Sequence, residues 1–333
     1  MGMIFKRCLS SLPLLFLLSV LAFSIIKCIP GDPVDVLLGN AQRDISPAQL
    51  ASMRSELGLD QPLWKQYSSW LGAVVTRGEF GRSYQDGRPA LSVIVERLPA
   101  TLILVGTALF VSFTLGTFWG MAMAFLKEGK LGSALDSLLV SCGLILYCAP
   151  GFWVGFLAIA LAFRFGAVLH LPLLSVHPPG RSIEPMFVGA YVLLPALVLA
   201  SRRTAKIALF VRAATLEEMS KEYAVFARSK GLSRMAVLTR HALKNSLLPL
   251  ISLMGLSLPA LLGGSVLVET VFAWPGMGRL AVEATFGRNY PVILALVLIY
   301  GTLVILANLI ADLLQMAVDP RQLSLETNTN GRV

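Results

Sequence analysis

The sequence predicts an all-α integral membrane protein with six transmembrane helices and a helical insert outside the membrane between the first two. The chain of 333 residues is 56% hydrophobic and only 14% charged, which is less charge than a soluble domain carries. Several uncharged runs reach the ~20 residues that a helix needs to cross a bilayer. Ten Lys/Arg against three Glu gather between residues 202 and 244, and this bias predicts that the connection lies on the cytoplasmic side.

The first span is predicted at 8–26, an uncharged run that follows Lys6 and Arg7. A basic start before an apolar run is also typical of a signal peptide. No small-x-small cleavage site follows the run, and Cys28 lacks the small preceding residue of a lipoprotein site. We therefore expect residues 1–29 to form a retained first helix with its N-terminus inside.

Residues 30–98 form the predicted insert, with seven Lys/Arg and eight Asp/Glu in near balance. Ser46 before Pro47 and Gln49 has the pattern of a capping box, so a helix should start there and end at Gly58. A second helix is expected over 63–77. Its apolar face is formed by Leu63, Tyr67, Trp70, Leu71 and Val74.

The second and third spans are predicted from the next two uncharged runs, 99–126 and 137–163. Lys127 and Lys130 mark a short inside turn between them. Pro150 followed by glycine predicts a kink within the third span.

The fourth span begins near 186, after a proline-rich outside loop at 164–185, and stays apolar only to 201. Three cations follow, Arg202, Arg203 and Lys206. At 1.5 Å per residue, Arg202 lies ~24 Å into a hydrocarbon core of ~30 Å. Such side chains can extend to the headgroups, or they can line a pathway and favour substrates that carry carboxylates. Both interpretations stay open.

The fifth and sixth spans are expected at 245–268 and 290–311, with a polar tail over 319–333. Small residues in the fifth span should let helices approach closely. They are Gly255, Pro259, Gly263 and Gly264. Six spans place both termini in the cytoplasm, on the same side as the basic connections.

The basic connection at 217–249 has a helical pattern that Gly231 interrupts. A glycine costs about 1 kcal/mol against alanine in a helix, so we expect a break between two short helices. The pattern is carried by Ala224, Ala227, Met235, Ala236 and Leu238. An amphipathic connector lying on the lipid surface is the alternative.

The segment ARSKGL at 227–232, with RHALKNSLLP at 240–249, resembles the cytoplasmic coupling loop of ABC importer permeases of the oligopeptide, dipeptide and nickel branch. The family's Glu-Ala-Ala start is only partly matched, since Val225 and Phe226 precede Ala227. The resemblance implies that a loop at about 212–245 contacts an ATPase. The implied coupling residues are Ala227, Arg228, Lys230, Gly231 and Leu232.

Two further regions are similar to the same family. PGDP at 30–33, LGLDQPL at 57–63 and GEFGRS at 78–83 look like its first periplasmic region. ETVFAWPGMGR at 269–279, followed by Asn289, resembles its most characteristic motif, although the family usually has Asp in place of that Asn.

The Pro-Gly-x-Gly of this last motif predicts a tight turn near the pathway or a partner, and an aromatic-belt loop is the alternative. The candidate residues for the pathway or periplasmic loop are Glu269, Phe272, Trp274, Pro275, Gly276 and Gly278.

Motifs for enzyme chemistry are missing from the sequence. It has no Walker A loop, no HExxH and no Gly-x-Ser-x-Gly elbow, so the chain should not hydrolyse ATP or peptides itself. Its four Cys and three His show no metal spacing, and we expect no cofactor. Its net charge of +9 lies mainly in one membrane-flanking loop, so nucleic acid is not an expected partner.

The resemblance implies the type I ABC importer permease fold, with a first helix at 1–29, a periplasmic insert at 30–98, a five-helix core at 99–318 and a tail. It implies an inner-membrane subunit that works by alternating access on short peptides or a nickel or metal chelate. The implied partners are a second homologous permease, two ATP-binding ATPase subunits and an extracytoplasmic substrate-binding protein.

Two other classes of function stay open. An ion-coupled carrier would need ionisable residues deep in the membrane, whereas Asp136, Glu269 and Asp312 lie near predicted span ends. A membrane receptor or anchor would bind partners without transport.

Overall fold

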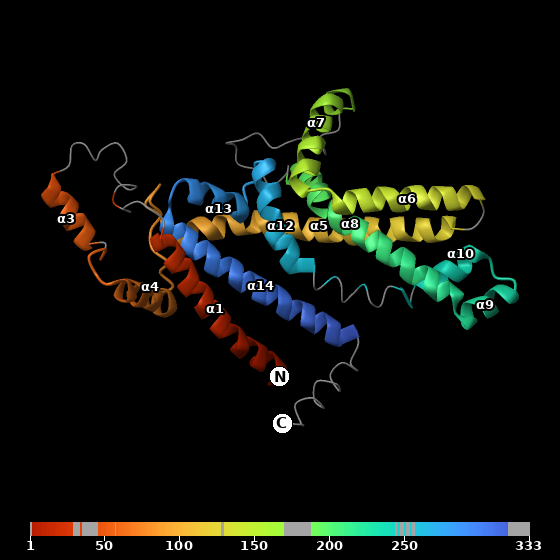
Figure 1. Cartoon of the computed structure of the whole chain (residues 1–333), viewed down its shortest axis with the longest axis horizontal. Helices are drawn as coiled ribbons and strands as arrows, with labels where there is room; N and C mark the ends of the chain where they lie inside the picture. The colour runs from red at the N-terminus through yellow and green to blue at the C-terminus, as the bar shows by residue number, and fades with distance from the viewer. Residues whose placement is uncertain are drawn as a thin grey trace. The chain divides into compact units, whose positions relative to one another are not determined.

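The computed structural model describes residues 2–28, 34, 46–56, 58–127, 130–169, 188–243, 245–246, 250, 254 and 257–318. Every named element in this part of the chain is helical (Figure 1). The elements are α1 (Gly2–Cys28), α3 (Pro47–Glu56), α4 (Leu63–Arg77), α5 (Ala90–Leu126), α6 (Lys130–Cys148), α7 (Gly151–Leu169), α8 (Val188–Ser220), α9 (Glu222–Ser229), α10 (Arg234–Val237), the π-helix η4 (Leu238–Ala242), α12 (Ser257–Val271), α13 (Met277–Phe286) and α14 (Tyr290–Val318).

Four described helices are long and apolar enough to cross a membrane: Leu9–Cys28, Ala90–Leu126, Lys130–Cys148 and Tyr290–Leu313. Two shorter apolar stretches lie at Gly151–Arg164 and Ser257–Val271. Several apolar helices confirm the predicted helical membrane protein. The count of six spans and the outside location of the insert stay predictions.

Contacts divide the chain into two compact units, residues 1–101 with 275–305, and residues 102–274 with 306–333. In the first unit, the start of α5 packs with α13 and α14 around the fully buried Ile94, Met277 and Ala295. α1 lies so close to α14 that a methyl group added at Gly301 would come within 2.6 Å of the Leu18 side chain.

The two insert helices have the predicted bounds. The Gln49 backbone N–H donates to Ser46 Oγ at 3.3 Å, and the Ser46 N–H donates to Gln49 Oε1 at 3.0 Å, which is a complete capping box. Gly58 takes a φ of +65° beyond the end of this helix. One residue of the predicted α4 face is wrong, because the Leu63 side chain is exposed.

In the second unit, α5 and α8 approach closely at two glycines. A Cβ added at Gly116 would lie 2.8 Å from Ile207 Cβ, and one at Gly120 would lie 2.6 Å from the Ala208 carbonyl oxygen. Of the small residues predicted to allow close approach in the fifth span, Gly264 faces α8, where an added Cβ would lie 3.6 Å from the Leu199 side chain. At Gly263 such an atom meets nothing within 4 Å, and Gly255 lies outside the described residues.

The helices extend beyond the apolar runs, because a helix need not end where charge begins. The predicted start of the second span at residue 99 is wrong. α5 starts at Ala90 and continues through Pro99 into the apolar run, because polar residues outside the membrane can form the same helix. α8 runs without a break past Arg202 to Ser220. The kink predicted at Pro150 is present, but it divides the predicted third span into two helices, α6 and α7, which run in different directions (Figure 1).

Two predicted connections lie largely outside the described residues. α7 extends to Leu169, so the described part of the loop expected at 164–185 is helical, and the rest of that loop is not described. The first half of the predicted fifth span is covered only at 245–246, 250 and 254.

Candidate functional site

The break predicted at Gly231 is present and closes α9. Gly231 has a φ of +88°, a conformation that favours glycine. Its N–H donates to the Arg228 carbonyl at 3.0 Å, and the Leu232 N–H donates to the Ala227 carbonyl at 3.3 Å. Ser233 then caps α10 by accepting from the Ala236 N–H at 3.3 Å. The result is a helix–turn–helix at the end of the long helix α8.

One side of this helix–turn–helix packs on its own chain. Ala224, Ala227 and Val237 are buried together, which joins α9 to α10. A second cluster joins Leu238 of η4 to Ala124 of α5 and to the end of α8. Ala227 is therefore a packing residue of the loop, at 8% exposure, whereas Met235, expected on the same face, is 48% exposed.

The other side presents apolar side chains to the surroundings. We call this the docking surface, formed by Val225, Phe226, Lys230, Leu232 and Met235. Phe226 is 61% exposed, and the Lys230 ammonium lies 4.5 Å from the centre of its ring. An exposed apolar patch with cations beside it is typical of a protein–protein contact.

Hydrogen bonds tie the loop to the helices next to it. Arg234 Nη2 donates to the Ala124 carbonyl at the end of α5, at 2.8 Å. Glu218 at the end of α8 accepts hydrogen bonds from Lys221 and Tyr223, and these bonds hold the pKa of its carboxyl below the usual value. Asn245 Nδ2 donates to Tyr223 Oη at 3.2 Å. The loop is thus anchored at both ends.

A buried ion pair joins α6 to α8 just before this loop. Arg212 donates to both carboxylate oxygens of Asp136, at 2.7 and 2.6 Å, and Asp136 is 1% exposed. Lys127 adds a second cation at 3.7 Å. The sequence showed Asp136 only as a charge near a span end, and no local signal links it to Arg212, 76 residues away.

The three predicted pathway cations have three different surroundings. Arg203 Nη1 donates to Ser257 Oγ at 2.6 Å, which links α8 to α12. The Arg202 guanidinium lies 5.1 Å from the ring centre of Tyr147. Lys206 is exposed. Of the three, Arg203 is the one that faces into the helix packing.

The segment 269–274 forms the turn expected of the characteristic motif, but at a different residue. α12 ends at Val271, Ala273 takes a φ of +53°, and the Trp274 N–H donates to the Glu269 carbonyl at 2.8 Å. The prediction that Pro-Gly-x-Gly itself makes the tight turn is therefore wrong, because the 6→1 hydrogen bond closes the turn one residue before Pro275.

The aromatic side chains of this motif are internal. Phe272 and Trp274 are each 1% exposed, and Glu269 is fully buried. Phe272 packs near Gly155 of α7, where an added Cβ would lie 3.5 Å from its ring. The alternative of an exposed aromatic-belt loop does not fit this burial.

Gly276 and Gly278 belong to the start of the next helix. Gly276 is the extended residue before α13, with a φ of −98°, and Gly278 is buried within its first turn. The Met277 N–H of the same turn donates to Thr101 Oγ1 of α5 at 2.8 Å. This contact holds the start of α13 in the first unit.

Asn289 joins two segments that the sequence presented separately. Its Oδ1 accepts from the Tyr84 N–H at 3.1 Å, and its Nδ2 donates to Ser83 Oγ at 2.9 Å. The side chain is 2% exposed. A carboxylate in place of the Asn289 amide could accept hydrogen bonds from both the Tyr84 N–H and the Ser83 hydroxyl. The amide contacts the same two groups, so it can position residues 83–84 as a carboxylate would.

Comparisons with known proteins match nearly the whole chain. The family model for the binding-protein-dependent transport system inner membrane component matches residues 116–324, and the model for the N-terminal region of such membrane components matches 1–105. The oligopeptide transport system permease protein AppB of Bacillus subtilis is 36% identical over 320 residues, covering 96% of this chain and 98% of the relative.

Other relatives have a similar extent. The dipeptide transport system permease protein DppB of Escherichia coli K12 is 35% identical, covering 91% of this chain and 93% of its own. A putative peptide transport system permease protein of Brucella abortus is 33% identical over 96% of this chain and 98% of its own.

Proposed function

This chain belongs to the family of binding-protein-dependent transport system inner membrane components, and we propose that it is the membrane-spanning permease subunit of an ABC importer for short peptides. The family makes it a multi-pass inner membrane transport protein. The peptide substrate is proposed because the similar relatives are named as oligopeptide and dipeptide permeases. A nickel or other metal chelate is the second substrate class.

The observation that carries this proposal is the docking surface on the helix–turn–helix around Gly231. Its apolar side chains, such as Phe226, are exposed, while the opposite side packs on α5 and α8. A separate ATPase subunit would cover the docking surface, with Arg228, Lys230, Gly231 and Leu232 at the contact. Ala227 would support the contact from inside.

The packing around α8 suggests how a movement of this loop is transmitted to the membrane-spanning helices. α8 has 33 residues and is therefore about 50 Å long. It is joined to α5 at Gly116 and Gly120, and to α6 through Asp136 and Arg212. Closure of two ATPase subunits would move these helices together, which is the form of motion that alternating access requires.

The proposed partners are two ATPase subunits, a second homologous permease and an extracytoplasmic binding protein. The test is uptake of labelled dipeptides, longer peptides and a nickel chelate into proteoliposomes that contain the whole complex. We expect uptake of peptides that requires ATP and the binding protein. Uptake driven by an ion gradient without ATP would instead indicate a secondary carrier, and binding without uptake would indicate a receptor or anchor.

The docking contact is tested separately by cross-linking. Ser229 is exposed beside the docking surface, so Ser229→Cys in a chain without other cysteines should cross-link to an ATPase subunit. Cys at Ser68, an exposed position on α4 in the first unit, is the control position. If no position from 225 to 235 cross-links, the docking proposal is wrong even when uptake needs ATP.

A further inference from the structure

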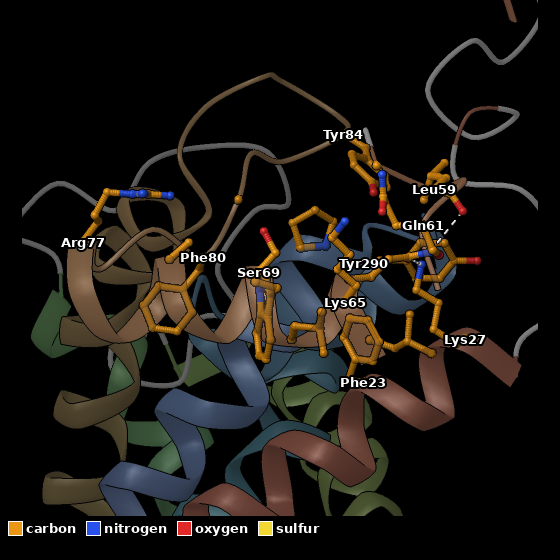
Figure 2. A pocket seen from close by; sticks show the side chains of 18 residues that line it. Phe23, Lys27, Leu59, Gln61, Lys65, Ser69, Arg77, Phe80, Tyr84 and Tyr290 are labelled. Atoms are coloured by element: carbon orange, nitrogen blue, oxygen red, sulfur yellow. Dashed lines mark hydrogen bonds between the residues drawn. The ribbon is translucent and has the colours of Figure 1, made fainter. Parts of the chain in front are cut away.

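A cavity of about 580 Å³ lies in the first unit, between the end of α1, the amphipathic helix α4 and the start of α14. Its volume is in the range that holds small organic ligands. Figure 2 shows Phe23, Phe80 and Tyr290 around it, with Lys27 and Arg77 at opposite ends. The proposed function makes no use of this cavity.

Among the residues that the structure describes, the charged side chains that line the cavity are all cations. Lys27, Lys65 and Arg77 line it, and its lining contains no carboxylate among the described residues. Lys27 is held in place, because its Nζ donates to Gln66 Oε1 at 2.6 Å and lies 5.5 Å from the Phe23 ring centre. Arg77 pairs through Nε with Glu79, and both side chains are more than 60% exposed. The cavity therefore attracts an anionic group.

The Gln66 amide is itself oriented by the backbone of the preceding turn. Its Nε2 donates to the Leu59 carbonyl at 3.0 Å and to the Gln61 carbonyl at 2.7 Å. These two bonds turn its oxygen toward Lys27. These hydrogen bonds therefore hold the Lys27 ammonium in a defined position.

Two hydrogen-bond donors inside the cavity are buried without a partner among the described residues. They are the Tyr290 hydroxyl and the Trp70 indole N–H, and both residues line the cavity. Tyr290 is only 6% exposed. Buried donors are nearly always satisfied, so these two point to a ligand with oxygen acceptors.

The position of α4 along α1 places the cavity at the edge of the bilayer. Tyr67 Oη of α4 lies 2.8 Å from Ser19 Oγ, and Ser19 is nine residues before the end of α1 at Cys28, or about 14 Å along the helix. α1 is one of the apolar candidate spans, and Phe16, Leu21 and Ile25 are exposed on it. α4 therefore lies beside the last third of a membrane helix.

The exposed apolar residues of α4 agree with that depth. Trp64 and Val75 are 71% and 75% exposed on the same helix that forms one wall of the cavity. A helix with apolar side chains on its outer face and cations near its ends is typical of the interface between lipid and water.

We propose that this cavity binds the anionic headgroup of a phospholipid. The phosphate would lie beside Lys27 and Lys65 and accept from Tyr290 and Trp70, and Arg77 at the opposite end would add to the positive potential of the cavity. The glycerol and the first part of an acyl chain would lie against the aromatic wall that leads to the exposed face of α1. A lipid fits both the cations and the apolar wall, whereas a free phosphate would leave the apolar wall without a partner.

The test measures contact between Trp70 and lipids directly. The full chain is placed in phosphatidylcholine nanodiscs that contain phosphatidylglycerol with brominated acyl chains, which quench nearby tryptophans. The Trp70 signal is the difference between the unchanged chain and Trp70→Phe. We expect stronger quenching of Trp70 by brominated phosphatidylglycerol than by brominated phosphatidylcholine at the same mole fraction.

Removal of the cations should weaken this preference. In Lys65→Gln with Arg77→Gln, the apparent affinity for brominated phosphatidylglycerol should fall roughly fivefold for each cation removed. The matched control is Lys130→Gln with Arg164→Gln, two exposed cations that do not line the cavity, and it should keep the preference. Equal thermal stability of the two double variants shows that both are folded.

Three results would overturn the proposal: equal quenching of Trp70 by the two brominated lipids, loss of the preference in the control variant, or no loss in Lys65→Gln with Arg77→Gln. Relief of the quenching by millimolar inorganic phosphate, or by a short peptide with a free carboxylate, would assign the cavity to a soluble anion instead. None of these measurements depends on an ATPase or on transport, so they stand apart from the proposed function.

Discussion

At the scale of single residues, the polar groups inside this protein are held by specific partners. Asp136 is almost fully buried and accepts two hydrogen bonds from Arg212. Asn289 is as deeply buried and uses both ends of its amide on residues 83–84. Burial of such groups is costly unless they are paired, so each pair fixes the place where two distant segments meet.

The Asp136→Asn substitution should destabilise the second unit. Arg212 would lose its counter-charge while its side chain stays only 21% exposed, and breaking such a pair costs about 3 kcal/mol. The measurement is the free energy of unfolding of the purified protein by denaturant titration in detergent.

The control for this substitution is Glu79→Gln, which breaks the Arg77–Glu79 pair. Both side chains of that pair are more than 60% exposed, so the loss should be below about 1 kcal/mol. Equal losses for the two substitutions would show that the Asp136 pair contributes no more than a surface pair.

Arg203 is the cation to test for a role in the pathway, because it donates to Ser257 between α8 and α12. If it faces the pathway, Arg203→Gln should lower the uptake of anionic peptides by about tenfold, or ~1.4 kcal/mol, and leave cationic peptides nearly unchanged. Lys206→Gln, at an exposed position on the same helix, should alter neither. Equal small effects across a series of peptide charges would assign the arginine to helix packing or lipid contact.

At the scale of elements, the helix–turn–helix of α9, α10 and η4 has an inside and an outside. The inside is made of small and branched side chains such as Ala224 and Val237, which allow the two short helices to meet closely. The outside is the docking surface. Because the loop is bonded to the ends of α5 and α8, it should move with those helices as one body.

Gly231→Leu should uncouple ATP hydrolysis from uptake. The added side chain has room within its own chain, since a Cβ at Gly231 meets nothing within 4 Å, so the main new contact would be with a docked partner. We expect uptake to fall by more than about tenfold while the complex still hydrolyses ATP, a difference above ~1.4 kcal/mol.

The control for this variant is Gly87→Leu. Gly87 also has a positive φ, +68°, and an equally open Cβ position, so both variants carry backbone strain of roughly 1–2 kcal/mol. Gly87 is far in sequence from the docking surface. If both variants lose uptake alike, strain rather than docking explains the loss.

At the scale of the whole molecule, the apolar helices and the distribution of charge together predict one membrane topology. We predict that the helix–turn–helix and its cations lie on the cytoplasmic side, and that the insert with α3 and α4 lies on the opposite side. The proposed lipid cavity agrees with this arrangement, because it lies where α1 ends and α14 begins.

Reporter fusions test the topology. Alkaline phosphatase fused after Gln85 should be active, because it would be exported, and the same enzyme fused after Ser229 should be inactive. Green fluorescent protein at the same two positions should give the opposite pattern. Equal signals at Gln85 and Ser229 would contradict six spans with both termini in the cytoplasm.

The sequence alone determined the features that depend on neighbouring residues. The capping box at Ser46, the bounds of α4 and the break at Gly231 were all predicted correctly, because capping, helical periodicity and glycine act within a few residues. The apolar runs determined the class of protein for the same reason, since crossing a bilayer is a property of one continuous segment.

The tertiary structure alone decided which distant groups are partners. Arg212 pairs with a carboxylate 76 residues away, and Asn289 with a hydroxyl 206 residues away. It also decided that Gly116, rather than Gly263, is where a helix backbone approaches, and that Ala273 takes the left-handed turn before Pro275. A polar residue in an apolar segment indicates that it needs a hydrogen-bond partner, and a small residue indicates that another helix can approach closely. Only the packing of the whole chain determines which group is the partner.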